Sequence, residues 1–221
     1  SIGTLGIKSK KFKKNLSNTT IDPIQLSKIL SNLKKQNINN VIMEASSHGL
    51  SQNRLDGLHF NTGIFTNLSQ DHLDYHKNIK NYLKAKLYLF EKLIKQNGSI
   101  ITDEKIPEFN KIKKIASNKN LNLFSLLDKK NNFQFLSHQF EDEAQLLKIK
   151  YNNSIHNIKL NLIGKIQLKN ILMAIIAAIK SDISIKDIFK VIPRIKSVNG
   201  RLEKIGKIKN NSKIILDYAH T

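Results

Sequence analysis

Cysteine and tryptophan are absent from this 221-residue sequence, and proline occurs only three times. Without cysteine, disulfides and thiolate metal sites are excluded, and a reducing compartment is expected. The longest apolar run, at 171–179, is far shorter than the ~20 residues that span a bilayer, so it predicts a buried helix. The composition fits a cytoplasmic protein, which is the location that we expect, and no membrane span is expected.

Arginine is also scarce, although the formal net charge is +20. A strongly basic surface would suit a nucleic-acid-binding module, because it releases counterions from phosphate backbones. However, 34 of the 37 basic residues are lysines, which are dispersed, and lysine, asparagine and isoleucine can all be encoded by A/T-rich codons. We expect no nucleic-acid partner and keep the basic module as an alternative. Arg54, Arg194 and Arg201 indicate positions where a planar guanidinium is needed.

Alternating apolar patterns predict the fold class. Helical spacing predicts helices over 23–33, 79–94, 106–116, 168–179 and 185–191, the first begun by Asp22 as a cap and Pro23. Apolar runs predict strands at 41–44, 63–67, 98–102, 121–126 and 213–216, with weaker alternation at 133–135, 145–149 and 156–160. The order predicts an α/β protein with a mostly parallel sheet flanked by helices and a smaller antiparallel sheet extension.

Chemically distinctive residues gather between positions 41 and 86. Glu44 and Asn67 end two predicted strands, and ligands of open α/β sheets bind at the carboxyl ends of strands. Glu44 with His72 offers a carboxylate and an imidazole, a donor pair that suits Mg²⁺ or Mn²⁺ held partly by phosphates. The alternative for 71–76 is a polar turn before a helix. Ser46 to His48 lacks the turn of a hydrolase nucleophile, so a hydrolase is not favoured.

Several motifs in order resemble the central domain of the Mur ligases, the ATP-dependent enzymes that build the peptide of peptidoglycan precursors. They are GTLG at 3–6, NTT at 18–20, EASSHGL at 44–50 with Gln52 and Arg54, TNLSQDHLDYH at 66–76, AK at 85–86, Gly164 with Asn170, Gly200-Arg201, and DYAHT at 217–221. The resemblance implies a P-loop-NTPase-like central domain over 1–212 and the start of the C-terminal ligase domain over 213–221. The phosphate-binding loop expected upstream of Ser1 is not in the chain, so we expect the fragment alone to be inactive.

Within the family, the sequence resembles the branch that adds the third amino acid, diaminopimelate or lysine, to UDP-MurNAc-L-Ala-D-Glu through an acyl phosphate. The resemblance implies the UDP-MurNAc-dipeptide and an amino acid as partners, ATP as co-substrate, and Mg²⁺. We expect a monomer. A different Mur ligase or a folylpolyglutamate-type ligase stays the alternative.

The resemblance also implies a role for each matching residue. Glu44, His72 and Lys86 would hold metal, and His72 and Lys86 would be catalytic, Lys86 as a carbamate formed with CO₂. Binding of the UDP-sugar-dipeptide is expected from Asn18, Thr19, Thr20, Ser46, Gln52 and Arg54. Binding of ATP is expected from Asn67, Asn170, Arg201 and Asp217, with Asn170 at adenine, Arg201 at the phosphates and Asp217 at the ribose. The motif before Asn170 departs from the family pattern, since it has Ile166-Gln167 in place of an aromatic residue or histidine followed by asparagine.

Overall fold

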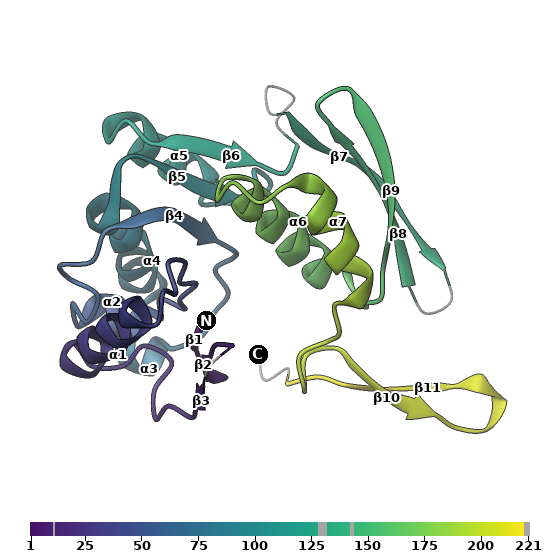
Figure 1. Cartoon of the computed structure of the whole chain (residues 1–221), viewed down its shortest axis with the longest axis horizontal. Coiled ribbons are helices and arrows are strands. Elements are labelled where there is room, and N and C mark those ends of the chain that lie inside the picture. Colours follow the sequence, from purple (N-terminus) through teal and green to yellow (C-terminus); the bar gives the residue numbers. More distant parts are fainter. Residues whose placement is uncertain (11, 128–131, 142–143, 219–221) are drawn as a thin grey trace. The chain divides into compact units, whose positions relative to one another are not determined.

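The computed structural model describes residues 1–10, 12–127, 132–141 and 144–218. The chain divides into two compact units (Figure 1). The first comprises Ser1–Asn61 and Leu68–Gly98, and the second comprises Thr62–Asn67 and the chain from Ser99 onward. Of the motif predicted at 217–221, only Asp217 and Tyr218 lie within the described residues. No helix of these ranges has both the length and the apolar composition that crossing a bilayer requires.

The first unit is mainly helical. Its elements are β1 (Ile2–Gly3), β2 (Gly6–Lys8), β3 (Lys13–Lys14), α1 (Pro23–Lys35), α2 (Ser47–Ser51), α3 (Leu73–His76), α4 (Ile79–Tyr88) and the π-helical turn η1 (Leu89–Leu93). The strands β1, β2 and β3 pair in that order as a small antiparallel sheet.

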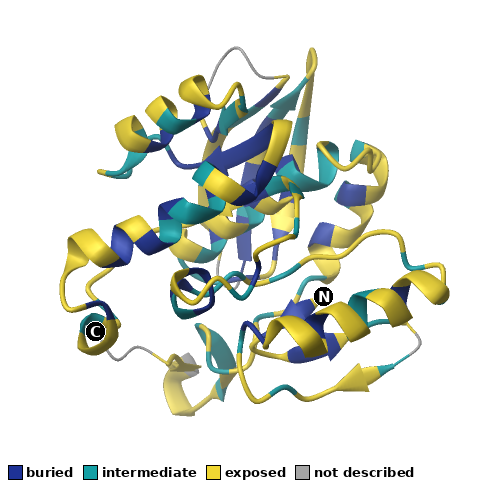
Figure 2. Ribbon diagram, turned by 90° about the vertical axis from the view of Figure 1, so that its left-hand side faces the viewer, coloured by how far each residue is buried: buried dark blue, intermediate teal, exposed yellow. Residues whose placement is uncertain are grey.

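Helix α1 begins where the sequence predicts. The carboxylate of Asp22 accepts a hydrogen bond from the backbone N–H of Gln25 at 2.9 Å, and Pro23 occupies the first turn, where its missing N–H leaves no donor unpaired. Leu26 and Leu33 are buried, while most of the remaining helix is exposed. Figure 2 shows helices with this division into a buried and an exposed side. The two leucines join an apolar core with Ile2, Ile7, Ile21, Leu50, Leu55 and Leu93.

The second unit contains most of the strands. The remaining elements are β4 (Phe60–Phe65), β5 (Ile94–Thr102), α5 (Phe109–Asn118), β6 (Asn122–Ser125), β7 (Phe133–Glu141), β8 (Ala144–Tyr151), β9 (Ser154–Leu160), α6 (Lys165–Ile179), α7 (Ile185–Val191), η2 (Ile192–Arg194), β10 (Glu203–Lys207), η3 (Lys209–Asn211) and β11 (Lys213–Leu216). Strands β4 and β5 begin in the first unit and end in the second.

Three sheets organise the second unit. Strand β5 is central in the order β4-β5-β6 and pairs with β6 in parallel, from Ser99 opposite Asn122 to Thr102 opposite Ser125. Strands β7, β8 and β9 form an antiparallel sheet, and β10 pairs with β11 as a separate antiparallel ribbon. This combination confirms the α/β class with an antiparallel extension.

Helix α6 carries the core of the second unit. It is apolar around much of its surface, as expected for a helix covered on several sides. Its buried residues Leu168, Leu172, Met173, Ile175 and Ile176 form one cluster with Ile101 of β5 and with Leu147, Ile149 and Ile158 of the antiparallel sheet. In Figure 1, α6 and α7 lie beside strands β7 to β9.

Several predicted elements differ from the structure in extent. The strand predicted at 63–67 is β4 and ends at Phe65, so Asn67 lies just beyond it, and the helix predicted at 106–116 begins at Phe109. The segment 41–44 is not a buried strand, because its pairing is a single parallel bridge between Met43 and Ile2, and the side chain of Ile42 is 79% exposed. The predicted helix at 79–94 ends as α4 at Tyr88, continues as a π-helical turn and gives way to β5 at Ile94. Ile94 is buried as a strand residue, so an apolar pattern alone did not separate the two elements.

Candidate active site

Glu44 is held in the first unit by Thr4. Its Oε2 accepts hydrogen bonds from the backbone N–H of Thr4 at 2.9 Å and from the hydroxyl of Thr4 at 2.6 Å. Gly3 permits this approach, since a Cβ there would lie 2.5 Å from Cδ of Glu44. Within the part of the chain that the structure describes, Oε1 accepts no hydrogen bond. The carboxylate is thus fixed through one oxygen and offers the other to a cation.

The threonines of the NTT motif lie beside this carboxylate. The hydroxyl of Thr19 lies 3.0 Å from that of Thr4 and acts as the donor, because the Thr4 proton is directed to Glu44. The buried hydroxyl of Thr20 donates to the carbonyl of Glu44 and accepts from the N–H of Ser46, both at 2.9 Å. The structure therefore brings together two predicted substrate residues with one predicted metal ligand. Asn18, which directly precedes Thr19, is exposed, and its side chain donates no hydrogen bond to any of the described residues.

Ser46 caps helix α2: its hydroxyl accepts a hydrogen bond from the N–H of Gly49 at 3.1 Å. This is an ordinary N-cap, so the motif has a structural function as well as its predicted one. Gly49 packs against Thr20, where a Cβ would lie 2.5 Å from Cγ2. Helix α2 therefore packs closely against the NTT segment at 18–20.

Arg54 and Gln52 follow α2 and form a linked pair. The guanidinium of Arg54 donates through Nη1 to the carbonyl of Thr20 at 2.6 Å and through Nε to Oε1 of Gln52 at 2.9 Å. The amide of Gln52 donates to the hydroxyl of Tyr75 at 3.0 Å. A guanidinium fork anchored in this way is pre-organised for an anionic or carbonyl-rich ligand.

His72 adopts a left-handed backbone conformation, with φ of 54°. Such conformations are uncommon for residues other than glycine, and they concentrate at functional sites. The N–H of His72 donates to Oδ1 of Asp71 at 2.7 Å, and Nδ1 lies 3.5 Å from the same oxygen. The strained turn fixes the imidazole at the start of α3, where its side chain is exposed.

Around His72 lies a cluster of aromatic rings from α2, α3 and α4. The ring of His48 is 5.0 Å from that of His72 and 4.2 Å from that of Tyr75, and the ring of His76 stacks on Tyr82 at 5.0 Å. Burial, and then the neighbouring His72, lowers the pKa of His48. The pKa of His76 is also lowered, mainly by burial and secondly by the neighbouring His48. The side chains of His48 and His76 therefore favour the neutral form.

Lys86 reaches the same cluster from α4. Its Nζ lies 5.1 Å from the centre of the Tyr82 ring, and the Tyr82 ring is 5.9 Å from that of His72. Burial raises the pKa of Tyr82, which keeps the phenol protonated. Tyr82 therefore contacts both predicted catalytic residues. Lys84, two residues earlier, is exposed instead.

The donor set fits a hard divalent cation only in part. Across the described ranges, no group of three or more histidine, aspartate, glutamate or cysteine side chains is arranged to hold a metal. Glu44 has one oxygen without a hydrogen bond and His72 is exposed, which suits an ion that keeps water and phosphate oxygens, as Mg²⁺ does. A carbamate on Lys86 would add the oxygen ligands that the unmodified chain lacks.

The four predicted ATP-binding residues belong to the second unit. Asn67 follows β4, and its Oδ1 accepts a hydrogen bond from the hydroxyl of Thr66 at 3.3 Å. Asn170 is exposed on α6. Asp217 accepts hydrogen bonds at Oδ1 from the N–H groups of Leu202 and Tyr218, which ties it to the turn that carries Arg201.

Gln167 connects α6 to that turn. Its amide donates to the carbonyl of Arg201 at 3.1 Å, and the guanidinium of Arg201 lies 5.5 Å from the centre of the Tyr218 ring. The structure thus brings Arg201 and Asp217 together and links them to the helix of Asn170. The residue that departs from the family pattern makes the link.

Sequence reasoning missed three residues that organise the site: Thr4, Tyr75 and Tyr82. Thr4 and Tyr75 lie inside recognisable motifs, which could have drawn attention to them. The motifs do not indicate which residues their side chains contact. Tyr82 matched an apolar helical pattern, which gave no indication of its contacts with Lys86 and His72.

Comparison with known proteins identifies the family. The profile of the Mur ligase middle domain matches residues 1–178. The chain belongs to the Mur ligase family. This confirms the resemblance drawn from the motifs.

Individual Mur ligases are similar along the whole chain. The UDP-N-acetylmuramoyl-L-alanyl-D-glutamate--2,6-diaminopimelate ligase of Zymomonas mobilis subsp. mobilis is 34% identical over 221 residues, which cover 100% of this chain and 46% of that protein. The ligase of the same name from Rickettsia montanensis is 35% identical over 226 aligned residues, with the same coverage. The chain therefore spans about half the length of the curated Mur ligases that it matches.

A solved structure of a UDP-N-acetylmuramoyl-L-alanyl-D-glutamate--2,6-diaminopimelate ligase is similar with a TM-score of 0.78 and 26% identity. The match covers 99% of this chain and 44% of that one. The predicted fold, a Mur ligase central domain of α/β class, is confirmed.

Proposed function

We propose that the protein containing this chain is the Mur ligase that adds the third amino acid to UDP-MurNAc-L-Ala-D-Glu. The observation that supports this most is the hydrogen-bonded group of Glu44, Thr4, Thr19, Thr20 and Ser46, which joins a candidate metal ligand to candidate substrate residues. The names of the similar ligases favour diaminopimelate over lysine as the added amino acid.

The reaction joins a carboxylate to an amine at the expense of ATP. A carboxylate oxygen of the dipeptide attacks the γ-phosphorus, the bond to ADP breaks, and an acyl phosphate forms. The amine nitrogen then attacks the acyl carbon, loses a proton, and the carbon–oxygen bond to phosphate breaks. Because the reactants are anions, catalysis consists mainly of holding them in place and compensating their charge.

The residues of the first unit would bind the sugar-peptide and the metal ion. Arg54, anchored on Thr20 and Gln52, would hold the sugar-peptide. Asn18 would donate a further hydrogen bond, and the hydroxyl of Thr19, whose proton is directed to Thr4, would accept one. Glu44 and His72 would hold Mg²⁺, which when bound would neutralise phosphate charge. A carbamate on Lys86, formed as its amine nitrogen adds to CO₂ and loses a proton, would turn a cation into an anionic oxygen ligand.

The residues of the second unit would bind the nucleotide. In this assignment Asn170 contacts adenine, Arg201 contacts the phosphates and Asp217 contacts the ribose, with Asn67 as a further ATP ligand. The contact from Gln167 to Arg201 supports a shared role for these residues. We further propose that residues 1–212 are the central domain and that the C-terminal ligase domain starts at 213. The whole protein would act as a cytoplasmic monomer.

The test is phosphate release by the full-length protein. It should require ATP, Mg²⁺, UDP-MurNAc-L-Ala-D-Glu and an amino acid together, and omission of any one should reduce it to background. Phosphate release that needs a folate acceptor instead would establish the folylpolyglutamate-type alternative. A lack of turnover combined with steeply salt-dependent DNA or RNA binding that Arg54→Ala leaves unchanged would favour the basic module.

A further inference from the structure

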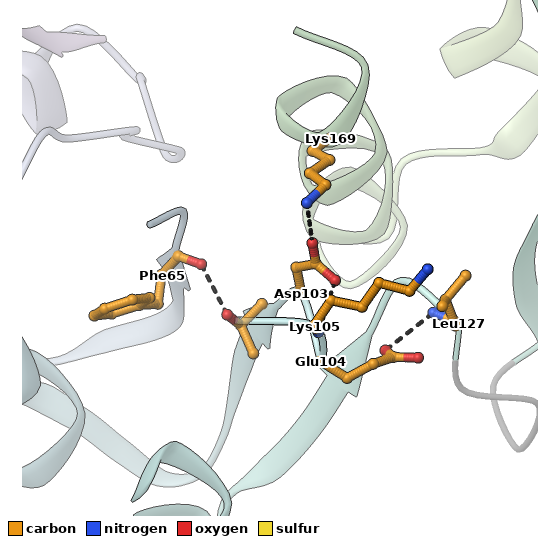
Figure 3. A network of polar contacts seen from close by, with 7 residues as sticks. Phe65, Asp103, Glu104, Lys105, Leu127 and Lys169 are labelled. Carbon is orange, nitrogen blue, oxygen red and sulfur yellow. Dashed lines mark hydrogen bonds and ion pairs between the residues drawn. The ribbon is translucent and has the colours of Figure 1, made fainter. Parts of the chain in front are cut away.

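Asp103 is a buried carboxylate immediately after β5, and Lys169 of α6 pairs with it. The Asp103 side chain is only 3% exposed, and its Oδ2 lies 2.5 Å from Nζ of Lys169 (Figure 3). Its Oδ1 accepts a hydrogen bond from the N–H of Lys105 at 3.0 Å. Among the described residues, Oδ2 has no partner other than this ion pair.

The end of β5 that carries Asp103 is itself fixed. The hydroxyl of Thr102 donates to the carbonyl of Phe65 at 2.9 Å, and Glu104 accepts a hydrogen bond from the N–H of Leu127 at 3.1 Å (Figure 3). Both neighbours of Asp103 are therefore anchored to other segments of the second unit. A helix paired with Asp103 is positioned against a rigid reference at the carboxyl end of a parallel strand, where α/β proteins bind ligands.

The half-exposed Lys169 and the buried Asp103 form an ion pair that is weak evidence for a role in stability. Removing a carboxylate from water is expensive, and apolar residues of similar size are often as good or better for stability. Helix α6 already has an extensive apolar face in the core. An apolar contact tolerates small shifts of a helix along or about its axis, whereas a close ion pair with a fixed partner does not. The ion pair thus fixes the position of α6 relative to β5 more than it stabilises the fold.

The geometry is imposed on the candidate nucleotide-binding part of α6. Lys169 directly precedes Asn170, and Gln167 holds the carbonyl of Arg201 from the preceding turn. At the start of the helix, the amide of Gln145 donates to the carbonyl of Gly164 at 3.3 Å. The first two turns of α6 are therefore held by three contacts, and Asn170, which is expected to contact adenine, lies in this part of the helix.

We propose that Asp103 and Lys169 are positioning residues for ATP. Their ion pair sets the start of α6 so that Asn170 meets the adenine base in one orientation. This inference rests on the proposed function of the same site. It extends that function to two residues that do not themselves touch the nucleotide.

The test uses the full-length protein with the double variant Asp103→Leu/Lys169→Met, which replaces the pair by apolar groups and leaves no buried charge unpaired. Its melting temperature should stay close to that of the parent. Its KM for ATP should rise by about tenfold or more, because small misplacements of positioning groups have effects of this size. The KM for UDP-MurNAc-L-Ala-D-Glu should not change.

Two further variants complete the design. Lys165→Met removes an exposed lysine from the first turn of the same helix and should leave the KM for ATP unchanged. Asp103→Asn keeps the shape of the side chain and serves if the double variant does not fold, and it too should raise the KM for ATP. An ATP KM within twofold of the parent in the folded variants overturns the inference alone. A parent protein that releases no phosphate from ATP overturns the proposed function, and this inference with it.

Discussion

The hydroxyl of Ser47 lies 3.0 Å from Nε2 of His76, and both residues are 5% exposed. The contact joins α2, which begins after Ser46, to α3, which begins after His72. It therefore holds the segment of the candidate substrate residues against the segment of the candidate metal ligand. The pair is a buried polar contact whose loss affects both sides of the site.

Acidification should destabilise the protein through His76. Burial and the nearby His48 lower its pKa in the folded state below the ordinary 6.5, so the unfolded chain binds the proton more readily. The stability from neutral His76 is complete above about pH 6.5 and is lost as the pH falls towards the lowered pKa.

Melting temperatures measured from about pH 7.5 down to about 5.5 test this, with His76→Gln as the comparison. The variant should melt lower at neutral pH, since disturbing a buried hydrogen bond costs about 1–3 kcal/mol. It should also lose less stability on acidification than the parent. Equal losses in both proteins would show that His76 does not carry the effect.

Thr4 should set the requirement for Mg²⁺. Thr4→Val removes the hydroxyl that holds Oε2 of Glu44 while keeping the size of the side chain. Groups that orient a metal ligand typically contribute about 10–100-fold to metal affinity, so the Mg²⁺ concentration for half-maximal activity should rise by that factor. Thr4→Ser retains the hydroxyl and should resemble the parent. A normal Mg²⁺ requirement in Thr4→Val would contradict the role.

Arg54 should not be replaceable by lysine. Arg54→Lys keeps the charge but cannot donate at once to the carbonyl of Thr20 and to Gln52. We expect the KM for UDP-MurNAc-L-Ala-D-Glu to rise by about tenfold or more, since hydrogen bonds to charged groups contribute about 1.5–3 kcal/mol. Arg194→Lys, at an exposed position with no assigned role, is the matched control and should have the parent KM.

Gln167 should influence ATP binding through Arg201. Gln167→Leu deletes the donor to the Arg201 carbonyl and should raise the KM for ATP by several-fold, in line with a contribution of about 1 kcal/mol from one hydrogen bond. Ile166→Ala changes an exposed neighbour in the same turn and should have no such effect. If both variants behave alike, the contact does not serve the nucleotide.

Much of the fold could be predicted from the sequence, because long patterns and capping residues are local signals. Helix α7 and strand β11 have the predicted bounds, and Asp22 caps α1 as expected. The segment at 41–44 failed because three apolar residues do not reveal how many strands will pair with them. The π-helical turn after Tyr88 has no sequence signal that separates it from α4.

The residues of the candidate site could also be predicted from the sequence, whereas the residues that they contact could not. Glu44, Thr20 and Arg54 stood out within motifs, and the structure joins them through hydrogen bonds over 24 to 34 residues of sequence. Such long-range contacts depend on the path of the whole chain. The left-handed conformation of His72 likewise belongs to the turn in which its N–H bonds to Asp71, and the residue type alone does not predict it.

The most direct measurement of the central claim is formation of UDP-MurNAc-tripeptide by the full-length protein, followed by mass spectrometry, with Lys86→Ala and Lys84→Ala compared. The account predicts tripeptide formation by the parent and by Lys84→Ala. Lys86→Ala should be slower by about 10²-fold or more, as for loss of a group that compensates charge, with partial recovery on adding a small carboxylate. No tripeptide from the parent, or a parental rate in Lys86→Ala, would contradict the account.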